Sequence, residues 1–486
     1  MPAEGGVNAP AEGARLARPL YDAALTEIAD YVQSALTPST AALATAHWSL
    51  LDALGCGLES LDYPACTKLL GPTVPGTIVP AGARVPGTSY ELDPVTAAFT
   101  LGTMIRWLDY NDTWLAAEWG HPSDNLGGIL AVADWQSRNG HPVAMRDVLV
   151  AMIKAYEIQG VLALDNAFNR VGLDHVVLVK VATTAVVAQM LGLPHDQITT
   201  ALSLAFVDGQ ALRTYRHAPN TGSRKSWAAG DATARGVRLA LIARTGEMGY
   251  PSALTAPQWG FCDASLRGAP LLRTQPYGQY VMENVLYKVS FPAEFHAQTA
   301  VECALALHPQ VKYRLGDIAR IVVRTQESAL RIIDKVGPLA NPADRDHCLQ
   351  YMIAVPLLHG RLTAADYEDA VAADPRVDAL RAKMVCVEDP AFSHDYLDPA
   401  RRSIANGVTI EFTDGSRLPE VVIEYPVGHR RRRDEARPLL AAKFRRNVER
   451  RFDGARRDAL IALAADPARL AAMAVRNFVD MMVIDP

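Results

Sequence analysis

The sequence predicts a mainly helical protein in which a smaller α+β domain is inserted into a large all-helical domain. Apolar residues recur with helical spacing from Tyr21 to about Arg273, whereas several later segments alternate apolar and polar residues as strands do. After Tyr425 the chain becomes charged and helical again. The 486 residues, of which 49% are hydrophobic, can build two or more domains around a substantial core. We therefore expect an all-helical domain over residues 1–275, a smaller α+β domain over 276–425, and C-terminal helices over 426–486 that return to the helical domain.

Helical spacing is clearest in the first part of the chain. The pattern predicts helices over Leu25–Leu36, Ser39–Glu59, Pro94–Leu108, Leu126–Asn139, Ala144–Leu162, Val176–Leu191, Asp196–Phe206, Ala228–Thr245 and Ser252–Ala256. The long apolar stretch from Val176 to Leu193 still contains Lys180, Thr183 and Gln189. A membrane-spanning helix needs about 18 or more consecutive apolar residues. We therefore expect a buried helix there, and a protein that does not enter a membrane.

Strand-like alternation appears in the second part of the chain. It predicts strands over Ile318–Thr325, Gly407–Phe412 and Arg417–Tyr425. The last two strands are joined by Thr-Asp-Gly-Ser at positions 413–416, which is a hairpin signal. Helical and strongly charged segments follow over Lys443–Phe452, Arg456–Leu463 and Pro467–Met482.

The stretch from Trp107 to Asn125 concentrates carboxylates, amides, hydroxyls and a histidine between apolar flanks. Buried polar groups are costly unless they pair with one another or with a ligand, so this density indicates the floor of an active site. If Thr103 to Trp114 is helical, Asp109 and Thr113 lie on one face, because residues four apart are neighbours on a helix.

The end of this stretch carries a second signal. Gly120 and Pro122 interrupt the run on either side of His121, and Ser123 is placed to cap the helix that begins at Leu126. The free N–H groups of a helix start, together with the side chains of Ser123 and Asn125, could receive a substrate carboxylate while His121 stays near the reacting carbon. The alternative interpretation is a capped turn whose polar residues are purely structural.

Four further segments carry unusual clusters of charged, amide and aromatic side chains: Asp208–Arg213, Gly222–Ala232, Phe291–His296 and Tyr425–Arg433. Together with Leu108–Asn125, and in the same order, they resemble motifs of the iron–sulfur-independent dehydratases of citrate-type acids. That family includes the 2-methylcitrate dehydratases and the cis-aconitate decarboxylases. The resemblance covers nearly the whole chain and implies the same domain plan, a homodimer and no cofactor.

The resemblance implies a hydro-lyase of the methylcitrate cycle in propionate catabolism. Such an enzyme removes water from 2-methylcitrate to give 2-methyl-cis-aconitate, with some activity on citrate or cis-aconitate. The six cysteines are scattered and include no Cys-x-x-Cys pair, whereas aconitase-like enzymes bind a [4Fe–4S] cluster through cysteines. We therefore expect side-chain acid–base catalysis without a metal.

The reaction needs a base, an acid and several cations. His121, His175 and Asp109 are the candidates for base and acid, and the sequence leaves the choice between them open. His175 stands in a polar loop just before the helix at Val176, from which it can face a cleft. By resemblance Lys225 occupies a position at the catalytic pocket.

Substrate contacts are expected from a basic loop and from the smaller domain. Arg224 lies in the Gly/Ser-rich loop beside Lys225, where a surface charge is an equally good interpretation. Lys288, Glu294 and His296 surround a turn that could close over the substrate across a cleft between the domains. Tyr351 lies at a family-like position, and we rank it above His347, for which a helix surface is the plainer interpretation. Three residues ahead of the basic loop are expected on the same wall, namely Gln210, Arg213 and Tyr215.

Three alternative functions stay open. The first is a cis-aconitate decarboxylase, although in those relatives a histidine tends to follow the Asp-Thr-Trp motif, where this chain has Leu115. The second is an epimerase of an amino-dicarboxylate, which abstracts a proton without elimination. The third is a non-catalytic helical protein that binds tricarboxylates.

The net charge and the N-terminal composition limit which partners the protein binds and in which compartment we expect it. The net charge is −5, and the one basic run, His429 to Arg433, is followed by Asp434 and Glu435, which is typical of a solvated turn or a subunit contact. We therefore expect no binding of nucleic acid. Residues 1–20 contain acids and no sustained apolar core, which fits neither a secretory signal nor a mitochondrial presequence. We expect a cytoplasmic protein with a short, loose N-terminal arm.

Overall fold

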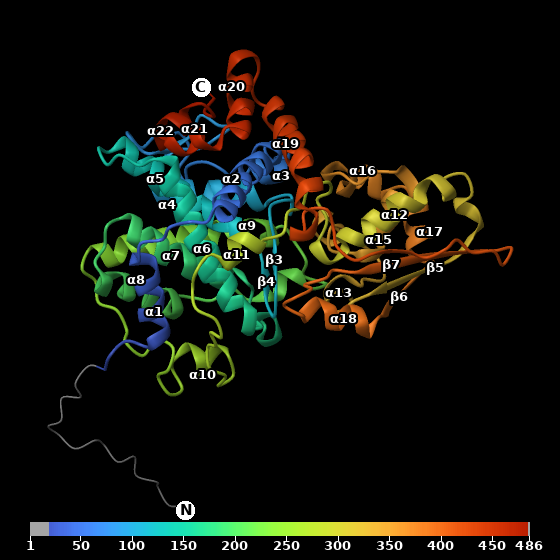
Figure 1. The fold of residues 1–486 in the computed structure, drawn as a ribbon, viewed down its shortest axis with the longest axis horizontal. Helices are drawn as coiled ribbons and strands as arrows, with labels where there is room; N and C mark the ends of the chain where they lie inside the picture. The colour runs from blue at the N-terminus through green and yellow to red at the C-terminus, as the bar shows by residue number, and fades with distance from the viewer. Residues whose placement is uncertain (1–18, 485–486) are drawn as a thin grey trace, which may run out of the picture.

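The computed structural model describes residues 19–484, so the N-terminal arm lies almost entirely outside the described residues. Two hydrophobic cores organise the described chain. One is built from residues between Leu25 and Val285 and again from Phe444 onward, and the other from residues between Phe291 and Phe412. Figure 1 shows the corresponding helical body on the left and the α+β body on the right. The prediction of a mainly helical fold with a smaller α+β part is confirmed.

Among the described residues, the helical body contains most of the long helices, together with three short ones of four or five residues. They are α1 (Ala23–Gln33), α2 (Thr40–Ser60), α3 (Pro64–Thr67), α4 (Pro94–Arg106), α5 (Leu126–Arg138), α6 (Met145–Asp165), α7 (Val176–Met190), α8 (His195–Val207), α9 (Arg224–Arg244), α10 (Phe261–Ser265) and α11 (Tyr280–Asn284). Two small hairpins accompany them, β1 (Ala83–Arg84) with β2 (Glu91–Leu92), and β3 (Trp114–Leu115) with β4 (Trp119–Gly120).

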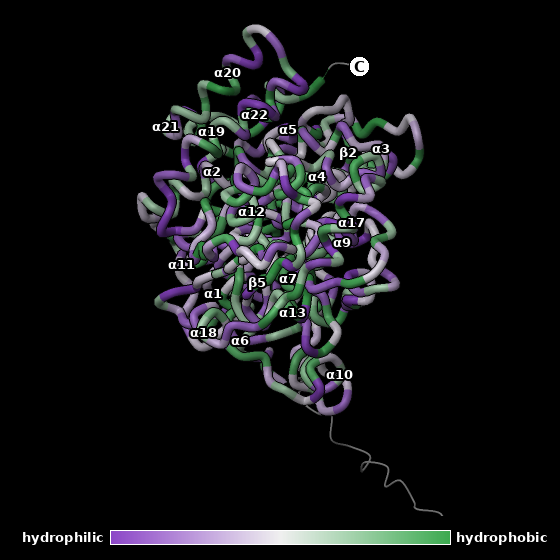
Figure 2. The backbone as a smooth tube through the Cα atoms, turned by 90° about the vertical axis from the view of Figure 1, so that its right-hand side faces the viewer, coloured by the Kyte–Doolittle hydropathy of each residue, from purple (hydrophilic) through white to green (hydrophobic). Residues whose placement is uncertain are grey.

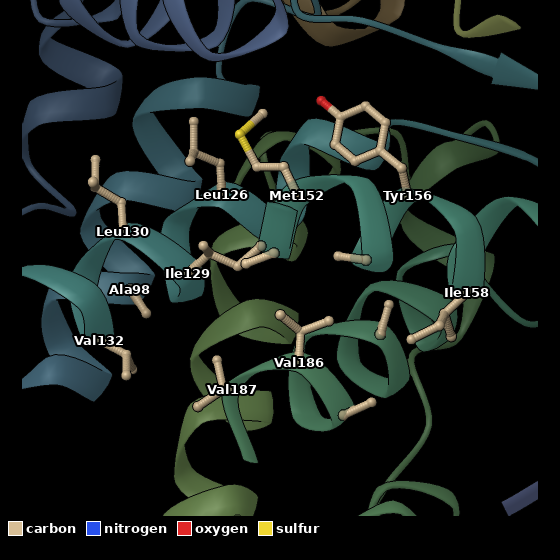
Figure 3. Close-up of a cluster of buried hydrophobic side chains, with 14 of the residues drawn as sticks. Ala98, Leu126, Ile129, Leu130, Val132, Met152, Tyr156, Ile158, Val186 and Val187 are labelled. Carbon is tan, nitrogen blue, oxygen red and sulfur yellow. The ribbon is translucent and has the colours of Figure 1, made fainter. Parts of the chain in front are cut away.

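The core of this body lies where α4, α5, α7 and α9 pack together. Its apolar side chains include Leu126, Ile129 and Val186, which Figure 3 draws side by side. Helices α4 and α9 cross with their backbones in contact, because a Cβ on Gly102 would lie 2.8 Å from the Cα of Gly230. Any larger residue at this crossing would push the two helices apart.

Two helix predictions in this body were wrong. Residues 252–256 form turns, since Pro257 follows them and the Asp22 carboxylate accepts a hydrogen bond from the backbone N–H of Leu254 at 2.7 Å. The proposed helix from Thr103 to Trp114 ends at Arg106. The chain turns there through Asp109, whose φ of 50° lies in the left-handed region.

The α+β body is built on a four-stranded sheet of order β6-β5-β7-β8. Its strands are β5 (Ile318–Thr325), β6 (Met384–Glu388), β7 (Asn406–Phe412) and β8 (Val421–Ile423), with β5 parallel to β6 and antiparallel to β7. Helices α12 (Gln298–Val311), α15 (Leu349–His359) and α17 (Pro375–Arg381) lie on one side of the sheet in Figure 1, and α13 (Glu327–Ile333) and α18 (Pro390–Leu397) on the other. Two short helices complete this body, α14 (Pro342–Arg345) and α16 (Asp369–Ala372).

The strand predictions for this body were partly correct. β5 and β7 match the expected ranges, but β8 is shorter than the predicted Arg417–Tyr425. Pro419 has no backbone N–H to donate, and regular pairing with β7 resumes only at Val421. Strand β6 was missed because its five residues alternate too briefly to be recognised.

The C-terminal segment forms α19 (Arg433–Glu449), α20 (Gly454–Ala465), α21 (Pro467–Ala472) and α22 (Val475–Asp480). These helices contact α2, α5 and α6, at the top of Figure 1. The predicted helix over Pro467–Met482 is therefore broken in two, at Met473 and Ala474. There the backbone pairs instead with the segment before α6, as in the 2.8 Å hydrogen bond from the Met145 N–H to the Met473 carbonyl.

A buried lysine ties the C-terminal segment to the rest of the molecule. The ammonium of Lys443 lies 2.7 Å from Asp52 Oδ1 and donates to the carbonyls of Tyr110 and Lys288 at 2.8 and 2.9 Å.

Purple, hydrophilic stretches lie on outer parts of the molecule in Figure 2, for example at α20. Within residues 19–484, no helix combines the length and apolar character needed to cross a bilayer.

Candidate active site

The β3–β4 hairpin presents one row of side chains toward the place where the two bodies meet. Leu115 lies opposite Trp119 in the pairing register, and Trp114 lies opposite Gly120. Because directly paired residues share a face and side chains alternate along a strand, Thr113, Leu115, Trp119 and His121 project together. Backbone hydrogen bonds of 2.8 Å in both directions fix Thr113 to Leu286.

This row lines a small, tightly packed pocket. Both bodies contribute to it, and its lining is Arg106, Asp109, Thr113, Leu115, Trp119, His121, His175, Arg213, Arg216, Lys288, Glu294, Phe295 and His347. Four of these side chains are cationic, so the pocket suits a small molecule that carries several carboxylates.

Asp109 is the electrostatic centre of the pocket. Its Oδ1 accepts a hydrogen bond from Arg106 Nη1 at 2.6 Å and another from the ammonium of Lys288. Burial alone would raise the pKa of this carboxyl group, but the charges of Arg106 and Lys288 outweigh burial and hold the pKa well below its usual range. Asp109 is therefore ionised, and it holds two cations in place.

His121 has the geometry of a base. Its Nδ1 lies 2.6 Å from the carbonyl oxygen of Asp112, and since a carbonyl can only accept, Nδ1 carries the proton. The lone pair of Nε2 is then free, and Nε2 lies 3.6 Å from Asp109 Oδ1. Burial and the positive charge of Arg106 lower the pKa of His121 well below the ordinary value. The ring is neutral and can take up a proton.

Lys225 belongs to a second buried group beside the pocket. Its ammonium donates to both carboxylate oxygens of Asp346 at 2.7 and 2.6 Å and lies 3.3 Å from His347 Nδ1. It also lies 4.0 Å from Asp109 Oδ2. Asp346 therefore occupies two of the three N–H groups of Lys225.

A metal ion has a poor position here. Among residues 19–484, one set of side chains could gather around an ion, namely Asp109, Asp346 and His347. The ammonium of Lys225 already contacts this set, and Lys288 binds Asp109 from the other side. The carboxylates that would hold a cation are thus neutralised by lysines, and the residues fit ammonium groups better than a metal.

Lys288 has a hydrogen-bond donor to spare at the pocket. It is fully buried, and its ammonium donates to the Asp109 carbonyl at 2.7 Å and to the Asp109 carboxylate. One of its three N–H groups is left for a ligand. Burial lowers the pKa of Lys288, which makes its ammonium a better proton donor.

Several buried nitrogens at the pocket face carboxylates without forming a hydrogen bond: His175 Nδ1 lies 3.2 Å from Asp174 Oδ1, Arg213 Nη1 lies 3.9 Å from Glu118 Oε1, and Arg106 Nε lies 3.9 Å from Asp124 Oδ2. Within the part of the chain that the structure describes, Arg106 Nε, Arg213 Nη1 and both ring nitrogens of His175 make no hydrogen bond. Arg216, by contrast, is bound to the Asp174 carboxylate. Buried polar groups normally make hydrogen bonds, so the nitrogens that make none indicate where a ligand binds.

The structure brings together about half of the residues singled out from the sequence. Asp109, Thr113, His121, His175, Lys288 and Glu294 line the pocket, and Lys225 lies beside it. His296 stands one step behind, where its Nδ1 lies 2.8 Å from Glu294 Oε1. Of the three residues expected on the wall before the basic loop, only Arg213 lines the pocket.

Four expected substrate contacts lie elsewhere. Ser123 and Asn125 belong to a short 3-10 helix and turn inward: the Ser123 hydroxyl donates to the Asp112 carboxylate at 2.7 Å and the Asn125 amide to Gln159 at 2.6 Å. Ser123 therefore does not cap the following helix. The other two pair away from the pocket, Arg224 with Asp231 at 3.0 Å and the Tyr351 hydroxyl with the Asp366 carbonyl at 2.6 Å.

Four residues of the site were missed or ranked too low. His347 is buried at the pocket and not on a helix surface, and its neighbour Asp346 holds Lys225. Arg106 lies in a helix whose surroundings are apolar, and an arginine at such a position was the signal that could have revealed it. Arg216 had no comparable signal, because its role depends on the distant Asp174.

The stability of the site should depend on pH through His347. Burial and the charge of Lys225 lower its pKa to about 4, whereas an unfolded histidine titrates near ~6.5. Its contribution to stability is therefore complete above pH ~6.5 and is lost as the pH falls toward 4. The stability advantage of the wild type over His347→Gln should shrink by about 2 kcal/mol between pH 7.5 and pH 5.

Urea unfolding of both proteins at the two pH values measures this change. The comparison with His347→Gln is needed because buried acids act in the opposite direction, as burial raises the pKa of Asp124 to about 7. An advantage that stays constant with pH would contradict the assignment of a neutral, buried His347.

Comparison with known proteins yields one family over most of the chain. A sequence model of the MmgE/PrpD N-terminal domain matches residues 26–273, and one of the MmgE/PrpD C-terminal domain matches residues 291–466. The chain is 66% identical to a 2-methylcitrate dehydratase from Cupriavidus necator over 475 residues, which is 96% of this chain and 98% of the relative. It is 63% identical to a 2-methylcitrate dehydratase from Escherichia coli K12 with the same coverage. A mitochondrial 2-methylcitrate dehydratase from Yarrowia lipolytica is 58% identical, over 96% of this chain and 91% of the relative.

Proposed function

The chain belongs to the MmgE/PrpD family, and we propose that it eliminates water from 2-methylcitrate to form 2-methyl-cis-aconitate. It is a carbon–oxygen lyase, and its substrate is a small tricarboxylate of the methylcitrate cycle. One observation carries the chemistry: a neutral histidine, His121, turns a free ring nitrogen toward a buried pocket lined by four cationic side chains.

Binding of three carboxylates follows from the charges of the pocket. Arg106 and Arg213 each have a buried N–H that makes no hydrogen bond among the described residues, and Lys288 has one N–H to spare. Charge-assisted hydrogen bonds from these groups can hold the substrate carboxylates firmly. Arg216 is neutralised by Asp174, so it supports the site from behind.

His121 acts as the base that removes the proton from the methyl-bearing carbon. The hydrogen bond from Nδ1 to the Asp112 carbonyl fixes both the tautomer and the direction of Nε2. As the proton leaves, negative charge develops on the neighbouring carboxylate, and donors already in place stabilise it without reorganisation. His175, whose ring centre lies 5.7 Å from that of His121, is a second imidazole that can donate to this charge.

Lys288 acts as the acid that protonates the departing hydroxide. Hydroxide is a poor leaving group unless it receives a proton as it departs. Asp109 contacts both Lys288 and His121, which places the acid and the base on neighbouring sides of one carboxylate. The substrate carbons that lose the proton and the hydroxide are also neighbours, so an acid and a base on one side chain's carboxylate suit this elimination.

An ultraviolet assay with chelator-treated protein tests the proposed function. Absorbance of the unsaturated product should rise when 2-methylcitrate is added without iron, and rise more slowly with citrate. Carbon dioxide is followed in parallel with cis-aconitate as substrate. Release of carbon dioxide without any dehydration would overturn the proposal in favour of the decarboxylase, and no reaction with any of the three acids would favour the epimerase or a binding protein.

We propose further that the protein is a homodimer in the cytoplasm. The resemblance of its motifs to the family supports the dimer, and six free cysteines, five of them buried, suit a reducing compartment. The basic run is used within the chain, since Arg430 donates to Asn284 at 2.8 Å and Arg432 to Glu302 at 2.8 Å. Light scattering should give about twice the chain mass of 52.6 kDa.

A further inference from the structure

One wall of the pocket is apolar. Leu115, Trp119 and Phe295 are the large apolar side chains that line it, whereas nearly all the other lining residues are charged or carry an imidazole. The three belong to one small hydrophobic cluster that also contains Leu286. The pocket therefore has a polar side that suits carboxylates and an apolar side that suits a hydrocarbon group.

The hairpin register places this apolar wall next to the base. Leu115 and Trp119 are direct cross-strand neighbours, and Thr113 and His121 come next on the same face. Consecutive positions on one face of a strand are about 7 Å apart. A carbon that gives its proton to His121 Nε2 therefore lies within one substituent's reach of Leu115 and Trp119.

We propose, on the basis of the proposed function, that Leu115, Trp119 and Phe295 form the subsite for the methyl group of the substrate and thereby favour 2-methylcitrate over citrate. The methyl group and the abstracted proton share one carbon. When that C–H bond points at His121, the carboxylate of the same carbon turns toward the cations, and the methyl group is left to face the apolar wall.

The apolar wall is held rigidly enough to distinguish a substrate with the methyl group from one without it. Trp119 is packed against two arginines, with the guanidinium of Arg213 at 5.1 Å and that of Arg331 at 5.5 Å from its ring centre. His296 packs against it edge-on at 5.7 Å. A rigid indole leaves Leu115 as the neighbour whose size can be changed with the least disturbance.

Leu115→Ala tests the subsite, with Leu286→Ala as the matched control. Both leucines are buried to the same degree, 6% and 5% exposed, and both belong to the same cluster, but Leu286 does not line the catalytic pocket. The measured quantity is the ratio of kcat/KM for 2-methylcitrate to kcat/KM for citrate, taken in one preparation. A ratio is independent of the fraction of active protein, so partial misfolding does not affect it.

Leu115→Ala should lower this ratio by about 4-fold or more, the value of one or two buried methylene groups. It should also raise the relative rate with 2-ethylcitrate, because the enlarged space accepts one more carbon. Leu115→Phe should make the subsite smaller and exclude the methyl group, so that citrate becomes the better substrate. Leu286→Ala should leave both the ratio of kcat/KM and the relative rate with 2-ethylcitrate unchanged.

Unchanged ratios in both Leu115 variants would overturn the subsite, as would an equal change in Leu286→Ala. Failure of the proposed function would look different, since the wild type would then dehydrate neither 2-methylcitrate nor citrate. The two failures are therefore distinguished by the wild-type protein alone.

Discussion

Replacing His121 by alanine should lower kcat for 2-methylcitrate by about 10²–10⁴-fold, the usual contribution of a positioned general base. The substitution removes the nitrogen whose lone pair faces the pocket and leaves the cations of the site in place. The KM should change little, because His121 is neutral and makes no ion pair with a carboxylate of the substrate. Steady-state kinetics with the ultraviolet assay measure both constants.

His195→Ala is the matched control for this variant. His195 is a partly exposed histidine that pairs with Asp30 on the surface, and its loss should leave kcat unchanged. Added imidazole should restore part of the activity of His121→Ala, since a small base can occupy the vacated space. A loss of less than about 10-fold, without rescue, would assign the base to another residue, of which His175 is the first to test.

Replacing Asp109 by asparagine should damage stability and activity together. Loss of one partner from a buried ion pair costs about 3–5 kcal/mol, because the remaining charge is left uncompensated. Here Arg106 and Lys288 would both lose their anion. Urea unfolding measures the change in the free energy of unfolding, and kcat should fall by about 100-fold or more because the acid and the carboxylate-binding arginine are no longer held.

The pH dependence of kcat in Asp109→Asn tests the role of Lys288 more specifically than the loss of activity does. The Asp109 charge raises the pKa of Lys288 against the effect of burial, so its removal should lower that pKa further. The proposed acid would then lose its proton at a lower pH, and the alkaline decline of kcat should move to lower pH.

Asp346→Asn provides the comparison, since Asp346 pairs with Lys225 and not with Lys288. It should lower stability without moving the alkaline decline. An identical shift in both variants would show that the alkaline decline of kcat depends on the overall charge of the pocket and not on the deprotonation of Lys288.

The local architecture was predictable because it depends on short-range patterns. The apolar spacing of α2, α5 and α7 sets helices that the structure reproduces within a few residues. The density of polar groups between Trp107 and Asn125 pointed to the site, since burial of such groups needs partners wherever the segment lies. Prediction failed where a distant partner decided the outcome, as at the turn held by Asp22, and also at Pro419, whose missing N–H shortens β8.

The sequence alone determined the helical and strand periodicity, the family resemblance, and the inventory of acids, bases and cations from which a site could be built. Only the tertiary structure decided how those groups are arranged. It made Asp109 an anchor for Arg106 and Lys288, turned Ser123 away from the pocket, and placed Leu115 and His121 in the lining of one pocket. The physical reason is that periodicity is a local property of the backbone, whereas an ion pair, a pKa or an apolar wall depends on which side chains packing brings within a few ångströms.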